Sequence, residues 1–279
     1  MTEMAYLNGE ILPIELAQIP IEDRGYQFGD AVYEFIASYN GKLFCMEEHL
    51  DRLDRSMQGL SFPPVSRDKI RNAVNLLFEK AGILRAGIYI QISRGVAPRN
   101  HVFPDKSEPQ IIMTIRKVEE KPLALRQNGA AAITVEDFRW GRCDLKTVQL
   151  LPNVLAKQKA VEAGMFDAVF VSDSIVREAT SSNFFIISNG SLVTHPLTRN
   201  ILPGITRMVI LKLCQREKIR VEERFFKTDE LYNADEAFLT GTVTEVLPIV
   251  RVDGRLIGEG RVGPITKQLY ELLRQYAGA

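Results

Sequence analysis

Residues 140–158 read WGRCDLKTVQLLPNVLAKQ, and they place one lysine, Lys146, between a polar segment and an apolar helical pattern. Other lysines of the chain lie in charged surroundings such as EEKP and REKIR. A lysine in this position is either a helix-edge charge whose stem covers apolar surface, or a buried amine. Burial disfavours the charged form of an amine and so yields a nucleophile. The stretch alone leaves both interpretations open.

The composition is that of a globular protein and argues against several classes. With 279 residues, 46% of them hydrophobic, the chain can form one large domain or two modest ones. The net charge of zero provides no field that would attract nucleic acid or an anionic membrane. No apolar run approaches the roughly 20 residues of a membrane span, and the start of the chain lacks signal-peptide features. Three scattered cysteines predict a reducing cytoplasm, and neither they nor the three histidines have zinc-site spacing.

The apolar pattern predicts strands and helices that do not alternate regularly. Two hairpins are expected, with Asn8-Gly9 and Asn40-Gly41 as their turns. Helices are expected over residues 47–60, 66–82, 151–164, 205–218 and 262–276. Strands are expected over residues 86–95, 109–118, 131–137 and 167–173, with further strand-like stretches in 175–196 and 219–254. The mixture favours an α+β or mixed α/β fold over a doubly wound parallel sheet.

A charged segment that contains proline and glycine, EEKPLALRQNG, separates two strand-like regions. We therefore predict a small α+β N-terminal domain over residues 1–118, an interdomain linker over 119–130 and a larger, β-rich domain over 131–279. In the first domain, the strand that begins near Ala31 alternates with period two. Its two faces are Tyr33, Phe35 and Ala37 on one side, and Val32, Glu34 and Ile36 on the other. The long loop GVAPRNHVFPDKSE at 95–108 is of the kind that carries function.

Three further stretches after the linker have residues suited to chemistry. Glu178 precedes a polar cluster, Thr180, Ser181, Ser182 and Asn183, which is either a solvated bend or a carboxylate with anion-binding groups beside it. Gly204-Ile205-Thr206 opens a helix, whose first-turn N–H groups favour phosphate, although such helix entries are common. Gly241 and Thr242 interrupt a strand pattern, which indicates either a plain bulge or a close backbone approach to a ligand.

Together with Lys146, these stretches supply a lysine, a carboxylate and two turns suited to phosphate. That set is what pyridoxal 5′-phosphate requires, because a lysine binds it as a Schiff base and a carboxylate keeps its pyridine nitrogen protonated.

The same residues resemble a known family over nearly the whole chain. The matching segments, in order, are EDRGYQFGDAVYE, EEHLDRL, RGVAPRNHVFP, the stretch at 140–158, EATSSNFF, ILPGITR and LTGTVTEVLPI. They resemble the fold-type IV pyridoxal-phosphate enzymes, or class IV aminotransferases, and within them the bacterial D-amino-acid aminotransferases. The resemblance implies a two-domain fold and ping-pong transfer of an amino group. Its implied substrates are D-amino acids such as D-alanine and D-glutamate, and 2-oxo acids such as pyruvate and 2-oxoglutarate.

The resemblance also implies residue roles. Lys146 would carry the cofactor and move the proton between the substrate Cα and the cofactor C4′, and Glu178 would face the pyridine nitrogen. Arg52 would bind the phosphate, and Leu202 would lie under the ring. The remaining cofactor contacts would come from Ser181, Ser182, Ile205, Thr206, Gly241 and Thr242. Tyr33 and Tyr89 match active-site tyrosines of the small domain.

Substrate choice is expected to depend on the loop at 95–108. In the family, an Arg-x-His pair on this loop grips the substrate α-carboxylate together with the strand tyrosine. Here the pair is Arg99 and His101, with Tyr33, and the loop would come from the neighbouring subunit of a homodimer. Phe35 and Ala37 share a face with Tyr33 and replace a smaller apolar residue and a lysine of relatives, so they are expected to reshape the side-chain preference.

Four alternatives compete with this interpretation. L-branched-chain aminotransferases share ILPGITR, but they usually carry a glycine and an arginine in the strand after the glutamate, where this chain has Phe35, Ile36 and Ala37 after Glu34. Aminodeoxychorismate lyase shares the cofactor site but eliminates pyruvate. A binding module of the same fold without catalysis would not need Lys146 and Glu178. A nucleotide binder of another fold would show a Walker-type or G-x-G-x-x-G run, which this sequence lacks.

Overall fold

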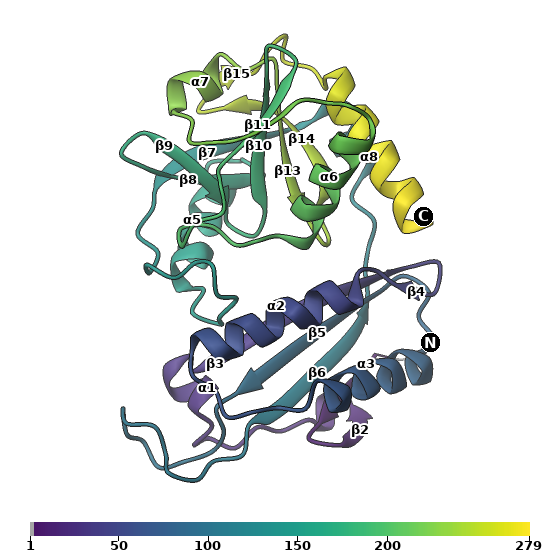
Figure 1. Ribbon diagram of the computed structural model, residues 1–279, viewed down its shortest axis with the longest axis vertical. Helices are drawn as coiled ribbons and strands as arrows, with labels where there is room; N and C mark the ends of the chain where they lie inside the picture. The colour runs from purple at the N-terminus through teal and green to yellow at the C-terminus, as the bar shows by residue number, and fades with distance from the viewer. Residues whose placement is uncertain (1–2) are drawn as a thin grey trace. The chain divides into compact units, whose positions relative to one another are not determined.

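The computed structural model describes residues 3–279, which form two compact units (Figure 1). The first unit comprises the residues up to Glu119 together with Leu145–Gln149. The second comprises Glu120–Asp144 and Leu150–Ala279. Each unit mixes helices with a sheet, which confirms the α+β class. The short segment that contains Lys146 therefore belongs to the first unit, although both of its flanks belong to the second.

The first unit is a six-stranded antiparallel sheet in the order β2-β1-β6-β5-β3-β4. Its strands are β1 (Met4–Leu7), β2 (Glu10–Pro13), β3 (Ala31–Tyr39), β4 (Lys42–Leu43), β5 (Ala86–Ser93) and β6 (Gln110–Lys117). Its helices are the 3-10 turn η1 (Ile14–Leu16), α1 (Arg24–Phe28), α2 (Met46–Gly59) and α3 (Arg67–Ala81). Asn8, Gly9, Asn40 and Gly41 all have positive φ, as two-residue hairpin turns require. Both predicted hairpins are confirmed.

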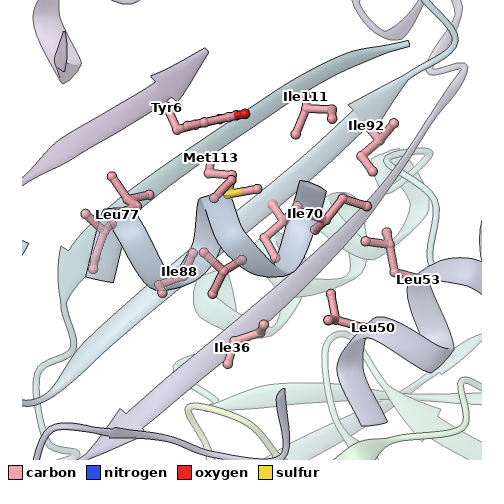
Figure 2. Packing of buried hydrophobic residues seen from close by; sticks show 14 of the residues in the cluster. Tyr6, Ile36, Leu50, Leu53, Ile70, Leu77, Ile88, Ile92, Ile111 and Met113 are labelled. Carbon is pink, nitrogen blue, oxygen red and sulfur yellow. The ribbon is translucent and has the colours of Figure 1, made fainter. Parts of the chain in front are cut away.

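Helices α2 and α3 cover one face of this sheet, and the core of the unit lies between them and the strands. Figure 2 shows Ile36, Ile88 and Met113 of the strands packed with Leu50 and Leu77 of the helices. Burial of each such side chain stabilises the fold by about 1.5–3 kcal/mol. The opposite face of β3 and β5 carries the predicted substrate residues, so the alternation expected for this strand is confirmed.

The second unit contains a nine-stranded sheet that closes on itself. Its strand order is β12-β11-β10-β13-β14-β7-β8-β9, with β15 paired to β14 and β9 paired back to β10. The strands are β7 (Ala130–Glu136), β8 (Asp167–Ser172), β9 (Ile175–Ala179), β10 (Asn183–Ser188), β11 (Ser191–Thr194), β12 (Val221–Glu223), β13 (Glu236–Gly241), β14 (Glu245–Val252) and β15 (Arg255–Leu256). The helices are α4 (Leu123–Asn128), α5 (Leu151–Glu162), α6 (Ile205–Arg216), α7 (Thr228–Tyr232) and α8 (Pro264–Ala277).

The pairing that closes this sheet joins Glu178 of β9 to Asn183 of β10. A closed sheet has no free edge at this point, so the ends of β9, β10 and β13 meet there. Within the segment 119–130, for which the sequence suggests a linker, the structure has helix α4. Arg126 of α4 donates to the Thr244 carbonyl at 2.8 Å and to the Glu245 carboxylate at 3.0 Å, so this stretch is anchored to the second unit.

Candidate functional site

Lys146 lies in a tight turn beside β3, in which the Thr147 N–H donates to the Leu145 carbonyl at 3.0 Å, and helix α5 begins only at Leu151. The Tyr33 N–H donates to the Lys146 carbonyl at 2.9 Å, and the Val148 N–H donates to the Ala31 carbonyl at 3.1 Å. The Lys146 N–H donates to Ser56 Oγ of α2 at 3.1 Å. The main chain is thus fixed on both sides of the lysine, which is not the helix-edge position considered from the sequence.

The half-buried Lys146 side chain faces an aromatic pair. Its Nζ lies 4.2 Å from the centroid of the Tyr33 ring, and the Tyr33 and Tyr89 rings lie 5.6 Å apart. Tyr89 donates from its hydroxyl to Gln91 at 2.7 Å. Burial, and then the charge on Tyr33, raises the pKa of Tyr89 to about 12. The structure therefore brings together Lys146 and both predicted tyrosines, with Tyr89 neutral near pH 7.

A buried ionic cluster lies on the helix side of β3. Glu34 accepts hydrogen bonds from Arg52 Nε at 2.6 Å and Arg52 Nη2 at 2.8 Å, and its Oε2 lies 2.6 Å from His49 Nδ1. Burial alone would raise the pKa of Glu34, but Arg52 and His49 hold it well below its usual range. Burial lowers the pKa of His49. Sequence reasoning missed Glu34 and His49 as partners of Arg52, although a glutamate at a core-facing strand position was a usable signal.

The loop at 95–108 places Arg99 and His101 against Phe28. The His101 ring centroid lies 5.4 Å from that of Phe28, and the Arg99 guanidinium carbon lies 5.0 Å from it. Both side chains are exposed. Within residues 3–279 of one chain, no polar or ring contact joins Arg99 or His101 to Tyr33. The predicted pair is adjacent, as its spacing requires, and it forms a group separate from the tyrosines.

Phe35 projects over the neighbouring strand. A Cβ on Gly87 of β5 would lie 2.3 Å from Phe35 Cζ, so the ring rests directly on this glycine. Phe35 pairs in register with Tyr89, and Ala37 pairs with Gly87. The ring of Phe35 thus occupies the space that a side chain at residue 87 would otherwise take.

In the second unit, Glu178 forms the centre of a polar network. One of its oxygens accepts from Arg139 Nη1 at 2.5 Å. The other accepts from Asn183 Nδ2 and from the Leu202 N–H, both at 3.0 Å. Asn183 also donates to the Leu202 carbonyl at 2.9 Å. The structure therefore brings Glu178 and Leu202 together, as two residues predicted to contact one ligand should be.

Arg139 is the most important residue of this network that the sequence analysis missed. Its guanidinium also binds Asp137 through Nε at 2.9 Å and Nη2 at 2.8 Å, and Asp137 in turn accepts from Arg177 at 2.6 Å. Burial raises the pKa of Glu178, and Arg139 acts in the opposite direction. The Asp-x-Arg pattern directly after a strand was the available signal, since such a spacing permits a local ion pair.

The two predicted phosphate turns lie beside this network. Gly204 is the N-cap of α6, whose first turn receives no side-chain cap. A Cβ on Gly204 would lie 2.0 Å from Asn183 Oδ1, so only glycine permits this approach. A Cβ on Gly241 would lie 3.1 Å from Ser182 Oγ, and Ser182 donates to Thr244 Oγ1 at 3.3 Å. Ile205 and Thr206 begin the helix, and Thr242 lies in the turn between β13 and β14, while Ser181 adjoins Ser182.

Among residues 3–279, no three His, Cys, Asp or Glu side chains are grouped as a metal site would need. No helix in this range combines the length and the apolar content of a membrane span.

The chain is similar in sequence to aminotransferases. Residues 31–252 match the family described as amino-transferase class IV. The D-alanine aminotransferase of Bacillus licheniformis is 42% identical over 272 residues, which are 96% of this chain and 94% of the relative. That of Staphylococcus aureus strain N315 is 41% identical over 275 residues, 98% of each protein.

Solved structures agree on the fold. The branched-chain amino acid aminotransferase of Escherichia coli superimposes with a TM-score of 0.89 at 27% identity, over 100% of this chain and 95% of that one. The branched-chain aminotransferase of Thermoproteus uzoniensis with norvaline gives a TM-score of 0.88 at 26% identity, over 98% of this chain and 94% of that one.

Proposed function

The chain belongs to the class IV aminotransferase family, and from this premise we propose that it transfers an amino group from a D-amino acid to a 2-oxo acid. The observation that carries the proposal is the 42% identity to a D-alanine aminotransferase over 96% of the chain. D-alanine and D-glutamate are the proposed donors, pyruvate and 2-oxoglutarate the acceptors, and pyridoxal 5′-phosphate the cofactor. A single cofactor that alternates between two forms gives ping-pong kinetics.

The donor set of the second unit fits a phosphorylated pyridine. A carboxylate has roughly four acceptor sites, and Glu178 accepts three N–H groups from protein, so it retains capacity for a ring N–H. The uncapped first turn of α6 supplies backbone N–H groups and a helix dipole for a phosphate. When bound, the cofactor supplies an electron sink that stabilises negative charge at the substrate Cα.

We assign the cofactor contacts accordingly. Glu178 binds the ring nitrogen, and its raised pKa favours sharing a proton with that nitrogen. Leu202 contacts the ring. Arg52 and the turns that contain Ser181, Ser182, Ile205, Thr206, Gly241 and Thr242 would hold the phosphate. Arg52 is oriented for this role by its paired hydrogen bonds to the buried Glu34.

We assign to Lys146 the amine that binds the cofactor and moves the proton of the substrate Cα. Its main chain is fixed by hydrogen bonds to Tyr33 and Ser56, while its four-carbon stem leaves Nζ able to move. The Tyr33 ring, 4.2 Å from Nζ, stabilises the ammonium form that results when the amine takes up a proton.

Arg99 and His101 are proposed to bind the substrate α-carboxylate together with Tyr33. In the proposed homodimer, the loop with Arg99 and His101 comes from one subunit and Tyr33 from the other. Their contact with Phe28 rather than with the tyrosines of the same chain supports this division. Phe35, held on Gly87, and Ala37 are proposed to set the size and polarity of the space for the substrate side chain. A cytoplasmic location completes the proposal and, like the homodimer, stays a prediction.

The second candidate is L-branched-chain transamination, which the likeness to two branched-chain aminotransferases favours. The visible spectrum of the holoenzyme, mixed without an acceptor with D-alanine or with L-leucine, separates the two. We expect only D-alanine to bleach the yellow band. Bleaching by L-leucine alone would refute the D-preference and support the second candidate. Inertness to both would refute transamination of these substrates and favour the lyase or a module without catalysis.

Replacement of Lys146 tests its proposed role. Lys146→Ala should abolish both the yellow band and transamination, since no other amine is assigned to the cofactor. Normal turnover by this variant would overturn the assignment of Lys146.

A further inference from the structure

Most of the loop at 95–108 is exposed, yet a buried arginine fixes its backbone next to Arg99 and His101, the two residues predicted to bind the substrate carboxylate. The Arg24 side chain is only 4% exposed. Its Nη1 donates to the Asn100 carbonyl at 2.6 Å and to the Val102 carbonyl at 3.4 Å. These two carbonyls flank His101, and Asn100 directly follows Arg99. One guanidinium thus fixes the backbone on both sides of the histidine.

A single aromatic ring supports both side chains of the pair. The centroid of the Phe28 ring lies 5.4 Å from that of His101 and 5.0 Å from the Arg99 guanidinium carbon. The Arg24 guanidinium carbon lies 4.8 Å from the same centroid. Arg24 and Phe28 are four residues apart on α1, the spacing that places two side chains on one helix face.

The helix that carries Arg24 and Phe28 is itself held at both ends. Asp23 caps its start by accepting from the Gly25 N–H, and Gly29 ends it in the left-handed conformation. Asp30 accepts from Arg24 Nε at 2.9 Å and from Arg94 Nε at 2.8 Å. Arg94 is also buried and donates to the carbonyls of Leu60 and Ser61. The support of the loop is therefore continuous with the body of the first unit.

We infer that Arg24 and Phe28 are positioning residues that hold Arg99 and His101 ready to bind the substrate carboxylate. The inference rests on the proposed function, which assigns the carboxylate to this pair. Arginine loses much rotamer freedom when it binds a ligand, and a side chain that is already held in place loses less of it on binding. Neither Arg24 nor Phe28 is expected to touch the substrate. Their effect is on substrate affinity rather than on the chemical step.

The test compares Arg24→Lys and Phe28→Leu with the wild-type holoenzyme. Lysine keeps the charge but loses the planar fork that reaches two carbonyls, and leucine keeps apolar volume without the ring. Loss of one hydrogen bond or ring contact is worth about tenfold in an equilibrium constant, so KM for D-alanine and for pyruvate should each rise about tenfold. The value of kcat should stay within about twofold, and the absorbance of bound cofactor should be unchanged.

Arg85→Lys is the matched control. Arg85 also lies over an aromatic ring, 3.9 Å from the Tyr39 centroid, and donates to a backbone carbonyl, that of Ser38, in the same unit. Its loss should leave both KM values unchanged. If Arg24→Lys does not fold, Phe28→Leu alone decides the question, because it removes no buried charge.

A double variant separates positioning from general destabilisation. Arg99→Ala removes a side chain proposed to bind the substrate carboxylate. In that background, Arg24→Lys should raise KM less than it does in the wild type, because one of the two residues that Arg24 positions is already absent. Two outcomes would overturn this inference and leave the proposed function intact. One is full additivity of Arg24→Lys and Arg99→Ala. The other is unchanged KM in Arg24→Lys and Phe28→Leu while Arg99→Ala raises KM. An Arg99→Ala enzyme with unchanged KM would overturn the proposed carboxylate role and this inference with it.

Discussion

Replacement of Gly204 by alanine should disrupt the Glu178 network indirectly, through the side chain of Asn183. The added Cβ would lie 2.0 Å from Asn183 Oδ1, where ordinary contact begins at 3.4 Å, so the amide must move by more than 1 Å. The Asn183 hydrogen bonds to Glu178, at 3.0 Å, and to the Leu202 carbonyl, at 2.9 Å, would then exceed hydrogen-bond range.

The magnitude follows from these two bonds. A hydrogen bond to a charged group contributes about 1.5–3 kcal/mol and a neutral one about 0.5–1.5 kcal/mol. The lower chain entropy of alanine in the unfolded state offsets about 0.4–1 kcal/mol. The net loss in the free energy of unfolding is therefore about 1–4 kcal/mol. Cofactor affinity should fall as well, because the start of α6 and the orientation of Glu178 both shift.

The chain offers a direct assay and a matched control. Trp140 is the only tryptophan and belongs to the second unit, so its fluorescence during urea unfolding reports on that unit. Gly141→Ala adds the same methyl where nothing lies within 4 Å, and its effect should stay within about 0.5 kcal/mol. If Gly204→Ala unfolds at the same urea concentration as Gly141→Ala and binds pyridoxal phosphate equally well, the reasoning from Asn183 is refuted.

Three other predictions concern the first unit. The free energy of unfolding of the first unit should fall as the pH drops below 6.5, because the unfolded chain then protonates His49 while burial keeps the folded residue neutral. His49→Gln should reduce the difference between the urea midpoints measured at about pH 7.5 and about pH 5.5. Gly87→Ala should cost about 1–3 kcal/mol by overpacking against Phe35, and Phe35→Leu in the same chain should recover most of that cost, so additive effects in a double-mutant cycle would contradict the contact. Leu77→Ala should cost about 2–5 kcal/mol, measured by circular dichroism in urea, because the residue is fully buried.

Features set by local chemistry could be predicted from the sequence. The helix expected over residues 66–82 is one example: Ser66 accepts from the Lys69 N–H at 3.3 Å and starts α3, and Gly82 ends that helix in the left-handed conformation. The face assignment of β3 followed from period two. The closure of the second sheet could not be predicted in the same way. Its closing pair, Glu178 and Asn183, is close in sequence, but the ring also needs β7 to pair with β14, two strands far apart in sequence whose pairing leaves no local pattern.

For the candidate site, the residue types were predictable and their partners were not. Glu178 and Leu202 have signals in their flanking motifs, and the structure brings them together. Arg139 escaped because its role depends on a carboxylate 39 residues later in the chain. Arg24 escaped because an arginine at the start of a five-residue helix resembles an ordinary surface charge. In both cases a decisive partner lies in a distant segment, Glu178 for Arg139 and the carbonyls of Asn100 and Val102 for Arg24.

The division of the chain has a consequence for protein synthesis. Leu145–Gln149 completes the edge of β3, but it is translated after the 25 residues of Glu120–Asp144, which belong to the other unit. At the usual 5–20 residues per second, a ribosome needs about 2–6 s to pass from Glu119 to Gln149. During that interval the nascent first unit has nearly all of its core but lacks the segment that carries Lys146. The residues of the proposed substrate loop are therefore synthesised some seconds before the proposed reactive amine.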